Sequence, residues 1–143
     1  MKSLEELYRI ADQQNITVDL FPLEKREALS LMELTGDCYI AIDPGKLKSR
    51  ADERNKLAHE LGHCCTGAFY NQYSRYNCRK RQENRADRWA IQQLIPANDL
   101  DDAIAHGCTE IWQLAEHFSV SEEFIRKAVC YHVHGNLATE LYF

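Results

Sequence analysis

The sequence predicts an α+β fold, in which an N-terminal helix and a small antiparallel sheet pack on a helical core. Two observations lead to this class. Residues 1–48 hold one helical pattern and three short stretches typical of strands, whereas apolar residues recur at helical spacing through most of 49–143. No linker rich in proline or glycine divides the 143 residues, a length that suits one domain with its own core. We therefore expect a single domain, 1–143, in which 97–143 is a region of supporting helices.

The first 23 residues predict a helix followed by a strand. Ser3 and Glu6 form the sequence signal of a capping box at the start of the helix. Apolar residues then recur at helical spacing: Leu4, Leu7, Ile10 and Ala11. Residues 16–23, ITVDLFPL, alternate in polarity and predict a strand that ends near Pro22.

Residues 27–43 predict a β-hairpin. The stretches EALSLMEL and CYIAID are typical of strands, and the three residues TGD between them place Gly36 in the turn. The tetrapeptide DPGK, residues 43–46, then ends the second strand in a turn.

Residues 49–96 predict two long helices. The first begins at Ser49 and carries two acidic residues in its first turn, and the second covers 83–95 and stops before Pro96. Residues 71–80, NQYSRYNCRK, have no hydrophobic period and predict a loop between them. Three shorter helices are expected after the proline, at about 98–105, 110–117 and 121–133.

The composition argues against two kinds of partner. A net charge of −5 disfavours a general nucleic-acid surface, and no apolar run approaches the ~20 residues of a membrane span. The N-terminus, MKSLEELYRI, lacks the apolar core of a signal peptide, so we expect a cytoplasmic protein. Its six cysteines are expected to be reduced, and no CxxC pair is present. The adjacent Cys64 and Cys65 are expected to be small buried thiols.

The segment KLAHELGHCC contains an HExxH motif, made of His59, Glu60 and His63. Positions four apart share one face of a helix, so both imidazoles can reach one metal ion. Glu60 projects roughly 100° away, near a water molecule on that ion. The other residues of 57–65 are uncharged, which suits a buried helix, where unpaired His and Glu side chains would be costly. HExxH also arises by chance, so an ordinary amphipathic helix is the alternative.

A third ligand is available on the next predicted helix. Glu83 and Asp87 lie four residues apart and therefore share a face of that helix. A zinc-binding histidine usually donates its far N–H to a carboxylate, which fixes the tautomer and the ring angle. We expect Glu83 to bind the metal and Asp87 to orient His59. The alternatives are that the two acids exchange these roles, or that they form a solvated face among neighbouring arginines.

Two neutral imidazoles and one carboxylate leave a fourth position for water, which is the pattern of catalytic zinc. Zinc lowers the pKa of that water toward ~7, and Glu60 can then take its proton and pass it to the leaving amine. This chemistry hydrolyses a peptide bond without a covalent intermediate. We expect one zinc ion per chain, with manganese or another divalent ion as the alternative. Four residues are candidates for stabilising the oxyanion, and the sequence does not choose among them: Tyr70, Tyr73, Tyr76 and His106.

The segments HELGH and ENRADRWAIQQLIP resemble the ImmA/IrrE-type zinc metallopeptidases of phages and integrative mobile elements. That family shows HExxH and then a Glu-x-x-Ala-Asn/Asp-x-Phe-Ala helix that ends in Leu-Met-Pro. Trp89 stands here at the Phe position, and Arg85 stands where many members have Glu, which favours Glu83 as the ligand. The likeness covers the chain from about Leu31 onward. It implies a zincin-like, gluzincin-type core and a protease that cleaves a helix-turn-helix repressor of the mobile element.

The C-terminal segment WQLAEHFSVSEEFIRKAV offers a second class of function. Its apolar spacing predicts two packed helices with a tight turn, as in helix-turn-helix domains. The alternative to a protease is thus a DNA-binding or protein-interaction regulator with a structural or vestigial metal site. However, the helix at the recognition position begins with Glu122 and Glu123, which would repel phosphates. We therefore expect this segment to support the protease core, with no direct contact to nucleic acid.

Three smaller features of the sequence concern other possible sites. A metal sensor would need a thiolate ligand, but Cys64 directly follows His63 and should point away from the ligand face. The basic cluster 75–88 is interpreted as a solvated loop and helix face. The C-terminal motif YHVHG, residues 131–135, has no acidic partner nearby, so we do not expect a second metal site there.

Overall fold

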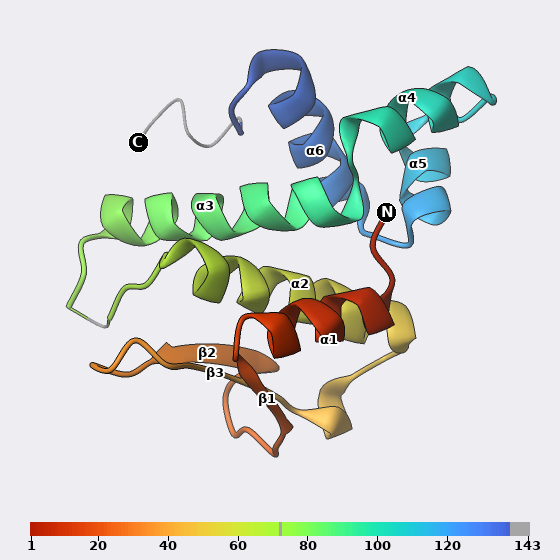
Figure 1. The fold of residues 1–143 in the computed structure, drawn as a ribbon. Coiled ribbons are helices and arrows are strands. Elements are labelled where there is room, and N and C mark those ends of the chain that lie inside the picture. Colours follow the sequence, from red (N-terminus) through yellow and green to blue (C-terminus); the bar gives the residue numbers. More distant parts are fainter. Residues whose placement is uncertain (72, 138–143) are drawn as a thin grey trace.

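The computed structural model describes residues 1–71 and 73–137, and its layers are stacked on both sides of one helix, α2 (Figure 1). The sheet lies on one side of α2, α3 runs along the other side, α6 lies beyond α3, and α4 and α5 lie past the end of α3. This arrangement confirms the predicted α+β class. In chain order the elements are α1 (Leu4–Gln13), β1 (Thr17–Leu20), β2 (Ala28–Met32), β3 (Cys38–Ile42), the 3-10 helix η1 (Pro44–Lys46), α2 (Arg50–Thr66), α3 (Tyr76–Leu94), α4 (Ala97–Ala105), α5 (Ile111–Phe118) and α6 (Glu122–His134).

Helix α1 begins where the capping box predicts. The Ser3 hydroxyl accepts a hydrogen bond from the backbone N–H of Glu6, and the Glu6 carboxylate accepts one from the N–H of Ser3. These two bonds satisfy N–H groups that have no partner within the helix. The buried face, with Leu4, Leu7 and Ala11, packs α1 against α2 and closes the N-terminal side of the core.

The sheet contains the predicted hairpin but is mixed rather than antiparallel. Strands β2 and β3 pair antiparallel around the turn at Gly36, as expected, whereas β1 pairs parallel with β3 on the other edge, in the order β1-β3-β2. The prediction was wrong because alternating polarity shows which face a side chain takes but not the direction of the strand. The connection 21–27 is long enough to reverse the chain, and the Lys46 ammonium anchors it by donating to the carbonyls of Leu23 and Arg26.

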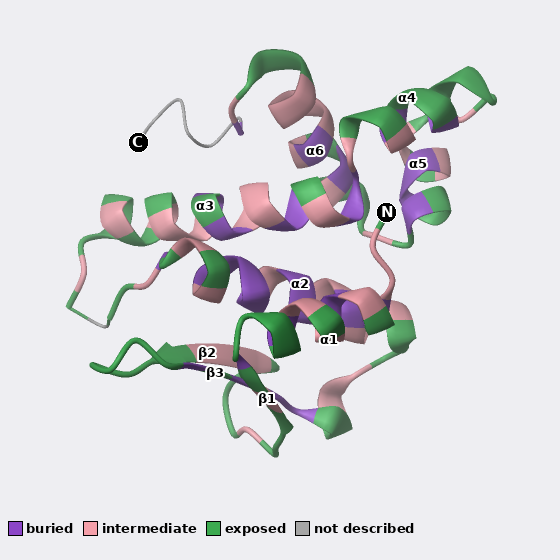
Figure 2. Cartoon of the chain, in the orientation of Figure 1, coloured by how far each residue is buried: buried purple, intermediate pink, exposed green. Residues whose placement is uncertain are grey.

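Helix α2 forms the centre of the core. Buried residues gather along it in Figure 2, and Leu57, Ala58 and Leu61 are fully buried. Gly62 allows an unusually close crossing with α3, because a Cβ atom at this position would lie only 2.5 Å from the backbone oxygen of Ala86. The glycine thus brings the backbones of the two helices close together beside the HExxH motif.

Helix α3 is longer than the sequence predicts. It begins at Tyr76 instead of residue 83, so the loop predicted over 71–80 is wrong for its second half. The first two turns of α3 are largely solvated, so they need no apolar stripe and show no hydrophobic period. Arginine, lysine and glutamine are good helix formers, which allows these turns to stay helical.

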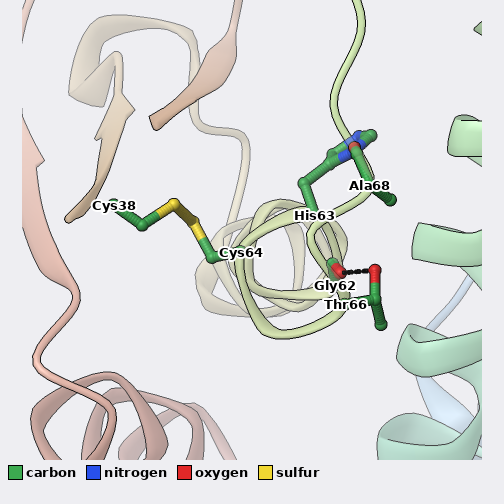
Figure 3. Close-up of a disulfide and its surroundings, with 6 residues drawn as sticks. All are labelled: Cys38, Gly62, His63, Cys64, Thr66 and Ala68. Atoms are coloured by element: carbon green, nitrogen blue, oxygen red, sulfur yellow. Dashed lines mark hydrogen bonds between the residues drawn. A yellow bond between two sulfur atoms is a disulfide. The ribbon is translucent and has the colours of Figure 1, made fainter. Parts of the chain in front are cut away.

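A disulfide joins Cys38 at the start of β3 to Cys64 near the end of α2. The expectation that all cysteines are reduced is therefore wrong for this pair, and Cys65 is exposed instead of buried. No CxxC motif indicated the bond, because its two cysteines lie 26 residues apart and meet only through the packing of α2 on the sheet. Cys64 and His63 leave α2 in different directions in Figure 3, so Cys64 points away from the ligand face as predicted.

The C-terminal helices α4, α5 and α6 follow the predicted boundaries to within one residue. Helices α5 and α6 pack on each other through a tight turn in which Ser119 is left-handed, with a φ angle of 55°. Side chains from the first turns of α2 hold this turn: Arg54 and Asn55 both donate to the carbonyl of Ser119. These hydrogen bonds join the helix pair α5 and α6 to the core helix α2. Across the described ranges, every helix is too short or too polar to cross a membrane.

Candidate metal centre

The two histidines of α2 and a glutamate of α3 converge on one point. The Nε2 atoms of His59 and His63 lie 3.2 Å apart. The Glu83 carboxylate spans both rings, with Oε2 at 2.9 Å from His59 Nε2 and Oε1 at 3.3 Å from His63 Nε2. The structure thus brings together the three residues that the sequence predicts as metal ligands.

The spacing of these atoms fits a divalent metal ion. Tetrahedral zinc, with bonds of about 2.0–2.2 Å to nitrogen and oxygen, needs ligand atoms about 3.3 Å apart. The three ligand atoms are close to that separation, and all lie within 4.8 Å of one another. In addition, the three donors come from two helices, and His63 and Glu83 line the groove, so a further ligand can approach the centre from that side.

Hydrogen bonds to the far nitrogens prepare both imidazoles to bind a metal. His59 Nδ1 donates to Asp87 Oδ1 over 3.0 Å, and His63 Nδ1 donates to the backbone carbonyl of Ala68. A carboxylate and a carbonyl can only accept, so both Nδ1 atoms carry the proton and a neutral ring offers its Nε2 lone pair. Asp87 therefore lies where the sequence predicts, behind His59, and the contact favours this role over the exchanged assignment of the two acids.

The pKa values of His59 and Glu83 show how strongly the centre attracts a positive charge. Burial opposes a charge on His59, but hydrogen bonds to Asp87 and Glu83 outweigh burial and raise its pKa to about 10. For Glu83, burial is again the largest influence, but its bonds to both histidines and to Tyr70 lower its pKa far below the usual range. A proton on His59 occupies the place that a metal ion would take, so metal binding should release it.

Glu60 is placed beside the ligands without joining them. Glu60 is only 9% exposed, and it lines the groove in front of the metal centre together with His63 and Glu83. It also lines a second hollow on the His59 side. This position lets its carboxylate reach a water molecule at the open side, as a general base must.

Of the four candidates for stabilising an oxyanion, the structure brings Tyr70 to the centre. The Tyr70 hydroxyl donates to Glu83 Oε1 over 2.8 Å, and burial together with this contact raises the pKa of Tyr70 to about 12. The phenol therefore stays a hydrogen-bond donor at neutral pH. Tyr73 and Tyr76 are largely exposed, and His106 bonds to the Asp102 carbonyl at the end of α4.

The groove in front of the centre has a volume of about 430 Å³ and an edge strand as one wall. Leu29, Ser30 and Leu31 of β2 line it, and β2 is one of the two edge strands of the sheet that the described residues form. Phe69 and two basic residues, Arg26 and Arg79, also line the groove. An edge strand beside a metal centre can pair with an extended peptide through its free backbone groups.

Three contributions to the centre were not foreseen from the sequence: the Ala68 carbonyl, the close crossing at Gly62, and Lys127 of α6. The Lys127 ammonium donates to Asp87 Oδ2 over 3.1 Å, although the two residues are 40 positions apart. A sequence offers no signal for such a pairing, because it depends on how α6 packs on α3. At the C-terminus, His132 bonds to the Ile95 carbonyl, and a second metal-binding group is not found among the described residues.

Two imidazoles and a carboxylate close enough to hold a metal ion, with a further glutamate beside them, are the side chains that metal-dependent hydrolases use. The family comparison agrees. The profile of a peptidase family, described as the IrrE N-terminal-like domain, matches residues 11–129, and the chain belongs to this family. The resemblance to ImmA/IrrE-type peptidases is therefore confirmed, and with it a metallopeptidase type of function. Comparison with curated proteins gives no significant match.

Proposed function

We propose that the protein is a zinc-dependent endopeptidase of the gluzincin type, which cleaves a protein by hydrolysis. The observation that carries this proposal is the meeting of His59, His63 and Glu83 at tetrahedral spacing, with Glu60 unliganded beside them. The alternative of a DNA-binding regulator is disfavoured because Glu122 and Glu123 occupy the first turn of α6.

The side chains divide the reaction among them. A zinc ion held by His59, His63 and Glu83 would supply a Lewis acid for the scissile carbonyl and for the attacking water. Glu60 takes a proton from that water and delivers it to the leaving nitrogen, so the same carboxylate acts first as base and then as acid. Asp87 holds the His59 ring in place. Tyr70, whose hydroxyl donates to Glu83 Oε1 in this structure, would turn that hydrogen to the oxyanion that forms on the substrate carbonyl.

Strand β2 provides the means to hold the substrate. An extended segment paired with its free edge would run along the groove and present successive side chains to Leu29, Leu31 and Phe69. Such pairing requires the substrate to be unfolded locally, as a linker or a surface loop is. The groove therefore suits an endopeptidase that acts on an exposed segment of a folded protein.

The resemblance supplies the substrate class that we propose: a helix-turn-helix repressor of a phage or integrative element, cleaved in the cytoplasm. The disulfide between Cys38 and Cys64 is unusual for that compartment. Thiol trapping in fresh cell extract, before any oxidation, would measure how much of the pair is bonded there. A fully oxidised pair would count against a cytoplasmic location.

The test of this function compares the wild-type protein with Glu60→Gln. The amide keeps the size of the side chain but cannot accept the proton of water. We expect the variant to retain its zinc and to cleave the element's own repressor at least about 100-fold more slowly, as measured on a gel with metal content determined in parallel. Glu123→Gln, on the exposed start of α6, is the matched control and should cleave normally.

Three outcomes would change the proposal. Normal cleavage by zinc-loaded Glu60→Gln would show that Glu60 does not activate the water. A wild-type protein that binds no zinc would remove the metal centre itself. If zinc-loaded wild type cleaves unfolded casein but not the repressor, the chemistry stands and the substrate class is wrong.

A further inference from the structure

The C-terminal helix pair contributes a charged side chain to the neighbourhood of the metal centre. Lys127 lies on α6, and its ammonium donates to Asp87 Oδ2 over 3.1 Å. The other oxygen of the same carboxylate, Oδ1, accepts from His59 Nδ1 over 3.0 Å. One carboxylate thus joins α6 to a ligand of α2, and both of its oxygens are held.

The register of α6 on α3 is fixed at several points, which keeps this contact in place. One turn beyond Lys127, the Tyr131 hydroxyl accepts a hydrogen bond from the side-chain amide of Gln92 over 2.8 Å. His132 follows with a bond to the carbonyl of Ile95 over 2.7 Å. Ile125 and Ala128 of α6 are fully buried in the core. Lys127 is therefore presented to Asp87 by a packed helix and not by a mobile segment.

Packing alone does not hold the Asp87 carboxylate. A hollow of about 300 Å³ opens beside Asp87 and His59, between α2, α3 and the turn that leads to α6. Without a second anchor, the carboxylate would have room to rotate and to exchange its bond with His59 for bonds with water. Lys127 supplies that anchor from the far side, and its side chain is itself only 31% exposed.

The negative charges around the centre also favour a positively charged side chain nearby. Glu60, Glu83 and Asp87 lie around two imidazoles that are neutral when they bind metal, so these five side chains and a divalent ion together would carry one net negative charge. The Lys127 ammonium balances that charge at Asp87, the carboxylate behind His59. A charge-assisted hydrogen bond of this kind is stronger than one between neutral groups.

We infer that Lys127 is a positioning residue of the metal centre, which fixes the Asp87 carboxylate and through it the orientation of His59. The inference rests on the proposed function, because it presupposes that His59 binds a metal ion. It also gives the C-terminal helix pair a task in the peptidase itself, in place of the nucleic-acid contact that its helix-turn-helix pattern suggests.

The experiment measures zinc affinity by competition with a chromogenic chelator. Lys127→Met keeps the apolar stem but removes the charge, and Lys127→Arg keeps the charge. Loss of a residue that directly supports a ligand costs about 10–100-fold in metal affinity, so the residue one bond further away should cost about 3- to 10-fold. We expect Lys127→Arg to restore most of this loss. Arg126→Met, on an exposed side chain of the same helix, should bind zinc as the wild type does.

A double-mutant cycle separates positioning from a general effect on the fold. In an Asp87→Ala background the carboxylate is gone, so Lys127→Met should change zinc affinity by less than about 2-fold. Circular dichroism and thermal unfolding of the metal-free variants check that α6 remains folded. If Lys127→Met does destabilise the protein, the comparison with Lys127→Arg and the cycle still decide the question.

Each contrary result overturns the inference. Wild-type zinc affinity in Lys127→Met would show that the contact does not matter. Equal loss in Lys127→Met and Lys127→Arg would show that the positive charge is not the reason, and an undiminished effect without Asp87 would place the action of Lys127 elsewhere. Absence of zinc binding in the wild type is seen before any variant is made, and it would overturn the proposed function together with this inference.

Discussion

Helix α2 has two sides, one that carries the polar side chains of the candidate metal centre and one that packs in the core. The side toward α3 and the groove carries His59, Glu60 and His63, whose polar atoms meet Glu83 of α3. The side away from these ligands carries fully buried leucines and the disulfide to β3. One helix can serve both purposes because its residues return to the same face every three to four positions. Chemistry and stability should therefore be separable by mutation along this single helix.

The largest effect is expected on the α3 side, from loss of a ligand. Glu83→Ala should abolish stoichiometric zinc binding, because it removes one of the three proposed protein ligands. Asp87→Ala should weaken binding by about 10–100-fold, since this residue only supports His59. Chelator competition measures both, with Glu123→Ala as the exposed control. The reverse order of the two affinities would show that the acids have exchanged roles.

On the opposite side of α2, Leu61→Ala should lower the stability of the fold and leave zinc affinity almost unchanged. Leu61 is fully buried, and removing such a side chain leaves a cavity that costs about 2–5 kcal/mol in the free energy of unfolding. Urea denaturation of the metal-free protein measures this loss, and zinc affinity should change by less than about 3-fold. A large loss of affinity with little change in stability would mean that the two sides are not independent.

The disulfide lies on the side of α2 away from the ligands, and it should contribute to the stability of the fold. Cys38→Ala opens a covalent link between residues 26 apart, which should lower the free energy of unfolding by about 3 kcal/mol. Cys78→Ala, at a free cysteine of α3, is the matched control. With reductant present, the difference between Cys38→Ala and the wild type should shrink to the small packing effect of the substitution. An equally large difference under reducing conditions would mean that the bond contributes nothing.

Gly62→Ala should lower both the stability and the zinc affinity, and its cost in the free energy of unfolding should be smaller than that of Leu61→Ala. The new Cβ would lie 2.5 Å from the Ala86 oxygen, so α2 and α3 must move apart. Overpacking of this kind costs about 1–3 kcal/mol, and the shift should also weaken zinc binding, because the ligands come from both helices. Cys65→Ala, on an exposed position of the same helix, serves as control. Unchanged zinc affinity would show that the ligands tolerate a wider crossing.

The comparison also explains which features the sequence could predict. His59 and His63, like Glu83 and Asp87, are spaced four apart, so local geometry already places each pair on one face of a helix. The bond from Asp87 to His59 needs only that the two faces meet. Lys127, the Cys38–Cys64 bond and the parallel pairing of β1 depend instead on how distant elements pack. No spacing in the chain encodes those contacts, so sequence analysis missed all three.

The covalent ring closed by the Cys38–Cys64 bond has a consequence for how the protein opens. Residues 38–64 contain β3 and nearly all of α2, including His59 and His63, whereas Glu83 and Lys127 lie outside the ring. Local opening events start in the parts that are least constrained. Backbone amides of α3 and α6 should then exchange with deuterated solvent sooner than those of α2, and bound metal should be released while the ring is still folded.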